Sequence, residues 1–363
     1  MTRLAEFLGR RRRLVLFAWV LIVVLALPFA SRQTEHLTGG GFDVPGSQSK
    51  AVSDALQNEF SSDSNGIAVL LEAEGASRAQ AALAVDRVRR EVAKLDEVTL
   101  PAPVARQAER KLAATGTALL PLTSERSPDD LIDSAADLRA DLNPGTALGG
   151  VTPYLIGQPT VWAGMQEISK KDLSEAEASG FPIVAIILLV VFGSLAAAVL
   201  PLALGFVSVL VTGAIIYFIS LQMTTSVFVT NMASMIGIGV AIDYSLFILA
   251  RYREEREAGR DMAEARREAL ATSGLAVTFS GLAVIISLAG LWMVDNQALR
   301  SMALGAMTVV AVSILTATTL LPALIAMLGD RVLPGGVVGR VERFIQQKIL
   351  RRPEKPKPQP GAA

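Results

Sequence analysis

The sequence predicts an α-helical membrane protein with six transmembrane helices and one α+β domain inserted between the first two. Three observations support this fold class. The chain is 51% hydrophobic with a mean hydropathy of +0.44, and its apolar residues gather in long runs. Residues 32–177 instead carry 14 basic and 22 acidic side chains, whereas the remaining residues carry 20 basic and 12 acidic ones. The chain therefore divides into an acidic, water-soluble domain and a membrane part flanked by basic residues.

Six apolar runs are long enough, at about 1.5 Å per residue, to cross about 30 Å of hydrocarbon. They cover residues 14–30, 180–192, 196–221, 224–250, 273–294 and 302–328, so that residues 1–31 hold the first span and 178–330 the other five. The second run reaches full length only as the continuation of the helix before it. The first has a second interpretation as a cleaved signal peptide, because four arginines precede it and it ends in Pro-Phe-Ala. We favour an uncleaved anchor, since cleavage would leave five spans in a bundle that the pattern indicates has six.

Arginines are concentrated at those ends of the runs that share one side of the membrane. By the positive-inside rule these ends are cytoplasmic, so both termini are expected in the cytoplasm and residues 32–177 outside it. We also expect a cytoplasmic interfacial helix at about 254–271 and, in residues 331–363, an amphipathic segment followed by a disordered tail. The arginines concerned are Arg3, Arg10, Arg11, Arg12, Arg13, Arg251, Arg253, Arg256, Arg260, Arg266, Arg267, Arg331, Arg340 and Arg343.

The acidic domain alternates short apolar strands with amphipathic helices. Strands are expected at 67–72, 117–122 and 152–156, and helices at 77–95 and 127–142, with a polar connection at 99–110. Ser127 is the expected cap of the second helix, because Pro128 and two acidic residues follow it. A further helix begins near 161 and has no stop signal before the second span. This order predicts an α+β sandwich of the split βαβ kind, anchored in the membrane at both ends.

The fourth run carries an ionisable residue, Asp243, about two-thirds of the way along it, followed by Tyr244. A carboxylate in hydrocarbon costs at least about 2.5 kcal/mol, so such a residue is kept where it has a function. Gly239 lies one turn before Asp243 on the same face. We expect Asp243 to point into a helix bundle, because a stripe of small residues suited to close helix packing lies on the adjacent face: Ala233, Gly237, Ala241 and Ser245.

Asp243 has two interpretations. It could make a structural hydrogen bond between helices, or it could carry protons, and the pattern favours the second. Buried hydroxyls in the fifth and sixth spans normally bond to their own backbone. A hydroxyl that faced Asp243 would instead be a relay partner, and Ser280 in the fifth span is the first candidate by depth.

The composition excludes several kinds of site. The chain has no cysteine, which excludes disulfides, thiol nucleophiles and thiolate metal sites. Its single histidine, His36, cannot by itself make a zinc site and is expected on the surface. We expect no cofactor, no metal and no nucleic-acid partner.

Several motifs occur together in one order. The fourth run and its end read GIGVAIDYSLFILARYREE, the fifth ALATSGLAVTFSGLAVIISLAGL, and the sixth ends in ATTLLPALIAMLG. GGGFDVPGSQS follows the first span, and VVFGSLAAAVLPL joins the second to the third. In these motifs the chain resembles the MMPL branch of the resistance-nodulation-division (RND) superfamily of proton-driven exporters, over residues 1 to about 350.

The resemblance implies export of lipids or other hydrophobic compounds across or from the inner membrane, driven by protons. Asp243 and Tyr244 match the family's proton relay, and Ser280 lies where the family has a polar partner. The domain at 32–177 would then be porter-like. Family members usually have two halves with twelve spans, and this chain resembles the amino-terminal half alone.

Three functions compete. The chain could be a half-size transporter completed by a second copy or another half, or a non-transporting scaffold or protein-export accessory subunit. An intramembrane aspartyl protease would need two carboxylates that share a proton, so we expect no enzyme. For the small-residue stripe we expect a partner helix that sets two Asp243–Tyr244 pairs face to face. The alternatives are that the stripe packs against the chain's own fifth and sixth spans, or that the chain is a remnant or a shortened piece.

Overall fold

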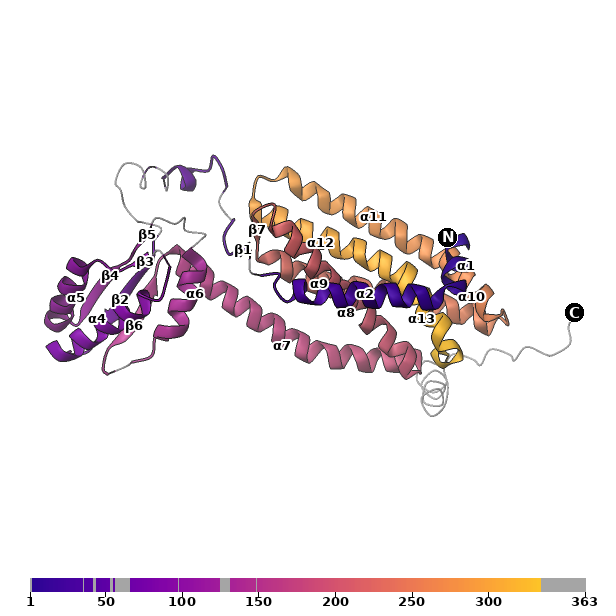
Figure 1. Ribbon diagram of the computed structural model, residues 1–363, viewed down its shortest axis with the longest axis horizontal. Helices are drawn as coiled ribbons and strands as arrows, with labels where there is room; N and C mark the ends of the chain where they lie inside the picture. Colours follow the sequence, from indigo (N-terminus) through magenta and orange to yellow (C-terminus); the bar gives the residue numbers. More distant parts are fainter. Residues whose placement is uncertain are drawn as a thin grey trace, which may run out of the picture.

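The computed structural model describes residues 2–34, 36–41, 44–52, 55, 66–96, 98–124, 131–147 and 149–333. The described residues form a helical bundle and a smaller α/β domain, which the long helix α7 (Gln158–Phe192) connects (Figure 1). The short helix α1 (Thr2–Arg10) lies at the end of the bundle that is farther from the α/β domain.

Six helical segments of the described chain are long and apolar enough to cross a membrane, in agreement with the six apolar runs of the sequence. The first four are α2 (Arg12–Ala30), α7, α8 (Leu195–Ser220) and α9 (Phe228–Glu257). The fifth joins α10 (Met262–Ala269), η1 (Leu270–Gly274), α11 (Leu275–Ala289) and η2 (Gly290–Met293). The sixth joins α12 (Gln297–Leu315), η3 (Thr316–Leu320), α13 (Leu321–Leu328) and η4 (Gly329–Val332).

The fourth span begins later than its apolar run. Helix α9 starts at Phe228, because the preceding residues form strand β7 (Thr225–Ser226), which pairs in parallel with β1 (Leu37–Thr38). The Val227 amide also donates to the Thr38 carbonyl at 2.8 Å. These backbone bonds connect the chain just after the first span to the loop before the fourth. Hydropathy alone could not reveal this pairing.

The prediction of a single cytoplasmic helix at about 254–271 is wrong, because two helices share this range. Helix α9 continues to Glu257, Gly259 then adopts a φ of 90°, and α10 starts at Met262. Asp261 caps α10 by accepting from the amides of Ala263 and Glu264 at 2.7 and 2.8 Å. The left-handed conformation that glycine permits turns the chain, so these charged residues fall on two helices.

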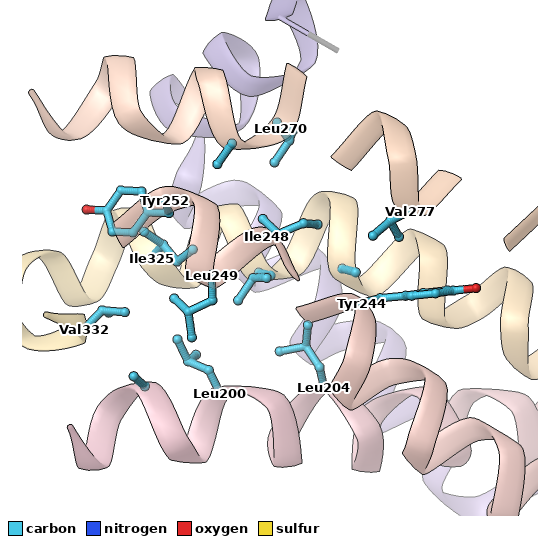
Figure 2. Packing of buried hydrophobic residues seen from close by; sticks show 14 of the residues in the cluster. Leu200, Leu204, Tyr244, Ile248, Leu249, Tyr252, Leu270, Val277, Ile325 and Val332 are labelled. Atoms are coloured by element: carbon cyan, nitrogen blue, oxygen red, sulfur yellow. The ribbon is translucent and has the colours of Figure 1, made fainter. Parts of the chain in front are cut away.

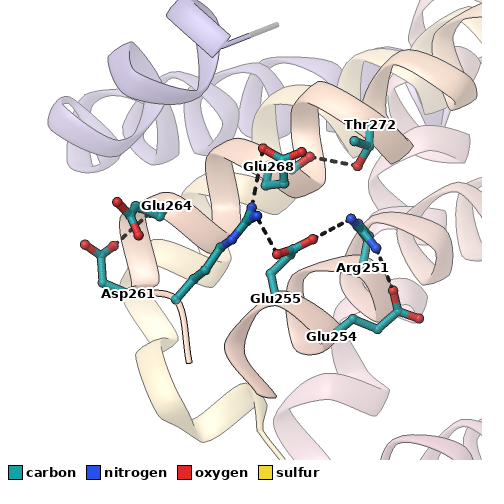
Figure 3. A network of polar contacts seen from close by, with 8 residues as sticks. Arg251, Glu254, Glu255, Asp261, Glu264, Glu268 and Thr272 are labelled. Atoms are coloured by element: carbon teal, nitrogen blue, oxygen red, sulfur yellow. Dashed lines mark hydrogen bonds and ion pairs between the residues drawn. The ribbon is translucent and has the colours of Figure 1, made fainter. Parts of the chain in front are cut away.

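Ion pairs connect the two sides of this turn (Figure 3). Glu255 is buried on α9 and pairs with Arg251 at 2.5 Å and with Arg260 at 3.1 Å. Arg260 also reaches Glu268 of α10 at 3.5 Å. Because a buried carboxylate needs charge compensation, these arginines stabilise the turn and hold α10 against α9.

The α/β domain has a three-stranded sheet in the order β4-β2-β6. The strands are β2 (Ala68–Glu72), β4 (Thr117–Pro121) and β6 (Thr152–Ile156), close to the expected positions. Both outer strands run antiparallel to β2 and therefore parallel to each other, and helix α6 (Leu131–Leu142) connects them along the chain. A second, two-stranded antiparallel sheet pairs β3 (Val98–Thr99) with β5 (Thr123–Ser124).

Helix α4 (Arg78–Val92) confirms the helix expected at 77–95. It begins with a reciprocal capping box, in which Ser77 and Gln80 each accept from the other's backbone amide. The expected cap of α6, Ser127, lies outside the described residues. Alternate β2 side chains and one face of each helix are buried together in the domain core, among them Val69, Leu71, Val85, Val88, Leu112, Leu120 and Leu138.

The polar connection expected at 99–110 is wrong, since α5 (Ala102–Thr115) covers most of it. Its buried face consists of Ala105, Ala108 and Leu112. Two of these three residues are alanines, so the apolar stripe was weak beside the charged residues that alternate with it. The hydrophobic pattern therefore understated a helix that packs through small side chains.

Helix α7 confirms the expectation of one helix that runs into the second span. It is 35 residues long, which corresponds to about 50 Å. Its membrane end is held by Arg253 of α9, which donates to the carbonyls of Phe192 at 2.5 Å and Val332 at 3.0 Å. The Arg253 guanidinium also lies 4.9 Å from the centre of the Phe192 ring. These contacts join the ends of the second, fourth and sixth spans.

The α/β domain lies beyond one end of the bundle, while α1, α10 and α13 lie at the other end (Figure 1). This separation agrees with the arginine pattern, but which end is cytoplasmic stays a prediction. We expect a cysteine at Ala114, exposed on α5, to react with an impermeant thiol reagent in whole cells. A cysteine at Ala258, exposed after α9, should react only in opened membranes. Each would be the sole thiol, and the reverse labelling would invert the orientation.

Candidate functional site

Helix α9 buries the stripe of small residues inside its own chain. A Cβ atom on Gly237 would lie 2.3 Å from Cγ2 of Val309 on α12 and 3.2 Å from Cγ2 of Val209 on α8. The stripe therefore faces the sixth and third spans. The prediction that a partner helix packs on this stripe is wrong, because α12 and α8 of the same chain already cover the stripe. They bury its other members, Ala233, Ala241 and Ser245.

The adjacent face of α9 is open. Asp243 is exposed on it, and a Cβ atom on Gly239 would have no neighbour within 4 Å. Met235 and Phe247 continue the same stripe at intervals of four residues, each 61% exposed. Asp243 thus faces out of the six-span bundle, which corrects the expectation that it points inward. We call Met235, Gly239, Asp243 and Phe247 the open face of α9.

Tyr244 and Ser280 lie beside Asp243. Tyr244 is 7% exposed and belongs to the apolar cluster that also holds Leu204 and Ile248 (Figure 2). Its hydroxyl lies beside Ser280 and Gly281 of α11, and Asp243 precedes Tyr244 in the chain. The structure therefore brings together the three residues that the sequence singled out, from two different spans.

Gly281 makes this approach possible. A Cβ atom at Gly281 would lie 3.1 Å from the Tyr244 hydroxyl oxygen and 2.4 Å from Cδ1 of Ile314. Any side chain at this position would separate α11 from both groups. Its place directly after Ser280 was the available signal in the sequence.

A second set of hydroxyls crosses the bundle core. Ser208 of α8 and Thr316 of η3 are fully buried and hydrogen-bonded at 2.9 Å. The hydroxyls of Thr212 and Ser313 are buried and have no partner in the described residues. Ser208 and Thr212 are one helical turn apart on α8, which is the signal that the sequence analysis missed.

An apolar pocket separates α7 from α9 on the side of the bundle nearer the α/β domain. Its volume is about 250 Å³. At that end, Ser234 of α9 donates to a carboxylate oxygen of Glu177 at 2.5 Å, and Asn231 donates to Ser169 at 2.7 Å. The sequence analysis did not identify this pocket, because its walls come from two distant spans. Its apolar lining includes Leu173, Phe181, Val184, Met235, Ile238 and Ile242.

Comparison of the sequence with known proteins identifies its family and several relatives. A model of the MMPL family matches residues 42–359. The chain is 42% identical over 340 residues to the mycolic acid-containing lipids exporter MmpL11 of Mycolicibacterium smegmatis, covering 91% of this chain and 35% of that protein. It is 40% identical over 346 residues to the heme uptake protein MmpL11 of Mycobacterium tuberculosis, covering 90% of this chain and 34% of that protein.

A more distant relative is the trehalose monomycolate exporter MmpL3 of Mycobacterium tuberculosis, 32% identical over 204 residues, or 56% of this chain and 21% of that protein. The chain thus spans about a third of the length of the MmpL11 relatives. The family match covers most of the chain, including every motif on which the resemblance rested from residue 42 onward. The chain belongs to the MMPL family and corresponds to the amino-terminal half of an RND/MMPL protein.

Proposed function

We propose that this chain is a six-span unit of a proton-driven exporter of lipids or other hydrophobic compounds in the inner membrane, with both termini in the cytoplasm. The observation that carries the proposal is the placement of Asp243 on the open face of α9, beside Tyr244 and Ser280. Two relatives named as lipid exporters support the substrate class.

Asp243 is the proton carrier in this proposal. An acid exposed at this depth of a span is costly in lipid, so it needs either a proton or a polar cover. The Tyr244 hydroxyl of α9 and Ser280 of α11 lie beside Asp243, and both can accept and donate a proton. Protonation removes the Asp243 charge and changes what can pack on the open face, which is how a local charge change moves helices.

A second six-span unit would cover the open face. Gly239 lets another helix approach α9 closely, and Met235 and Phe247 offer apolar contact on either side of Asp243. This surface replaces the small-residue stripe as the place where the relay is completed. A second copy would set its own Asp243–Tyr244 pair against Asp243, and a different half would supply its own polar partner there.

The pocket between α7 and α9 is the proposed site for a lipid chain. Its walls are apolar, and the hydrogen-bonded Glu177 and Ser234 stand at one end. An acyl chain matches the walls, and hydroxyl donors of a headgroup match the remaining carboxylate oxygen of Glu177. Because α7 runs on into the α/β domain, a lipid held here would lie at the base of that domain.

We expect Ile238→Trp, which fills the pocket, to abolish photocrosslinking of a diazirine-bearing fatty acyl lipid to α7 and α9. Ile286→Trp on α11 is the matched control, since Ile286 is 72% exposed and lies outside the pocket. The measurement is the amount of crosslinked peptide from each helix, at equal protein levels. Equal crosslinking of α7 and α9 in Ile238→Trp and in the unmodified protein would contradict a chain site in this pocket.

A further inference from the structure

Arg266 of α10 is a buried arginine at the end of the bundle that carries α1. Its side chain has no ion pair in the described residues, and the residue is 9% exposed. Its Nε atom is fully buried and has no hydrogen-bond partner among the residues described. A Cβ atom on Gly9 would lie 2.2 Å from its Nη2, so the α1 backbone lies directly against the guanidinium. The two terminal nitrogens are not among the buried unpaired atoms and therefore reach the surface beside Gly9.

Two further polar side chains near Arg266, Arg12 and Tyr252, have no carboxylate bonded to them among the described residues. Arg12 is exposed at the start of α2, acts electrostatically on Arg266, and donates to the Ala326 carbonyl at 2.5 Å. Tyr252 of α9 is 0% exposed, and its hydroxyl has no hydrogen-bond partner within the part of the chain that the structure describes. This hydroxyl points away from the Tyr244 end of the bundle (Figure 2). Arg266 and Arg256 are the basic groups that act on it.

The acidic residues nearby are bonded to other groups. Asp330 pairs with Arg256 at 2.8 Å, and Glu6 pairs with Arg267 at 3.7 Å. Asp261 accepts from the amides at the start of α10, and these bonds hold its pKa below the usual value. The buried Arg266 guanidinium lies against Gly9, and Arg12 follows Gly9 by three residues. Neither arginine therefore has a carboxylate bonded to it among the described residues. A buried charge without a partner is destabilising, so an anion that bonded to the accessible nitrogens of Arg266 would stabilise this cluster.

We propose that Arg12 and Arg266 bind the phosphate of an anionic phospholipid from the leaflet at this end of the bundle, with Tyr252 behind them. A lipid fits better than a free anion because Arg12 begins a membrane-spanning helix and stands in a run of four exposed arginines. Phe7 of α1 is also 49% exposed and lies 5.7 Å from the Arg11 guanidinium. Basic clusters beside a span, and basic pockets between spans, attract anionic headgroups.

The test is native mass spectrometry of the full chain in detergent, titrated with phosphatidylglycerol or with phosphatidylcholine of the same acyl chains. We expect selective binding of phosphatidylglycerol, lowered about tenfold or more by Arg12→Gln and by Arg266→Gln, since each variant removes a hydrogen bond between charged groups at the phosphate. Arg12→Gln keeps the test valid if Arg266→Gln fails to fold, because Arg12 is exposed.

Arg13→Gln is the matched control, since it removes the same charge from the next residue. A loss as large as that of Arg12→Gln would mean diffuse attraction to the surface and would overturn the proposal. Equal affinity for the two lipids would overturn it as well. Inorganic phosphate should not displace the lipid at equal concentration, and displacement would show a site for free anions instead.

Discussion

Asp243→Asn is expected to abolish proton-driven transport while leaving the protein folded and inserted. The variant keeps the size of the side chain but cannot exchange a proton, and loss of a positioned proton-transfer group lowers rates by about a hundredfold or more. The fold should survive because Asp243 lies on the open face of α9, away from the packed stripe. The measurement is lipid efflux from proteoliposomes that contain the assembled transporter, with an imposed pH gradient.

Asp295→Asn is the matched control for this experiment. Asp295 is exposed, pairs with Arg300 at 3.1 Å, and lies between η2 and α12, outside the spans. It should transport normally. Tyr244→Phe should transport more than Asp243→Asn, since it keeps the carboxylate. Near-normal transport by Asp243→Asn at matched protein levels would rule out the relay and favour a scaffold or protein-export accessory.

Gly237→Ala is expected to destabilise the bundle more than a change at any position on the open face. Its Cβ atom would lie 2.3 Å from a Val309 methyl group, and overpacking of this kind costs about 1–3 kcal/mol. Gly239→Ala is the matched control two residues away, with no neighbour within 4 Å of its Cβ. It should be neutral or stabilise helix α9 by up to about 1 kcal/mol. The melting temperatures of the two variants in the same detergent provide the comparison.

A larger residue separates packing within the chain from packing against a partner. Gly239→Leu should leave the melting temperature of the six-span unit unchanged but lower its association with a second unit, measured by crosslinking in native membranes. Gly237→Leu should prevent the six-span unit from folding. If Gly239→Leu lowered stability as much as Gly237→Leu, the open face would be packed within the chain and could not receive a partner.

Much of the fold could be predicted because its signals are local. The six apolar runs, the strands near 68–72, 117–121 and 152–156, and the helix capped by Ser77 each follow from residue type and spacing over a few turns. The predictions that were wrong also have local physical causes. The buried face of helix α5 consists mostly of alanines, which give a weak hydrophobic pattern. The charged segment at the end of α9 is divided into two helices by one glycine with positive φ.

The candidate site was predictable in its residues but not in its orientation. Asp243 was recognisable because a carboxylate within an apolar run is costly. The sequence could also show that Gly237 and Gly239 lie on different faces of α9. It could not show which face the third and sixth spans would cover, since that depends on contacts between residues 72 positions apart, such as Gly237 and Val309. The pocket between α7 and α9 depends on distant contacts in the same way.

The length and continuity of α7 make it a lever. A helix of 35 residues spans about 50 Å, so a tilt of the whole helix by about 5° about one end would carry the other end about 4 Å. Arg253 holds the Phe192 end of this helix to α9 and Val332, and Ser169 and Glu177 bond to α9 farther along it, so that α7 moves together with α9. A small repacking of helices around Asp243 would then tilt α7. The α/β domain at one end of α7 would move farther than the Phe192 end.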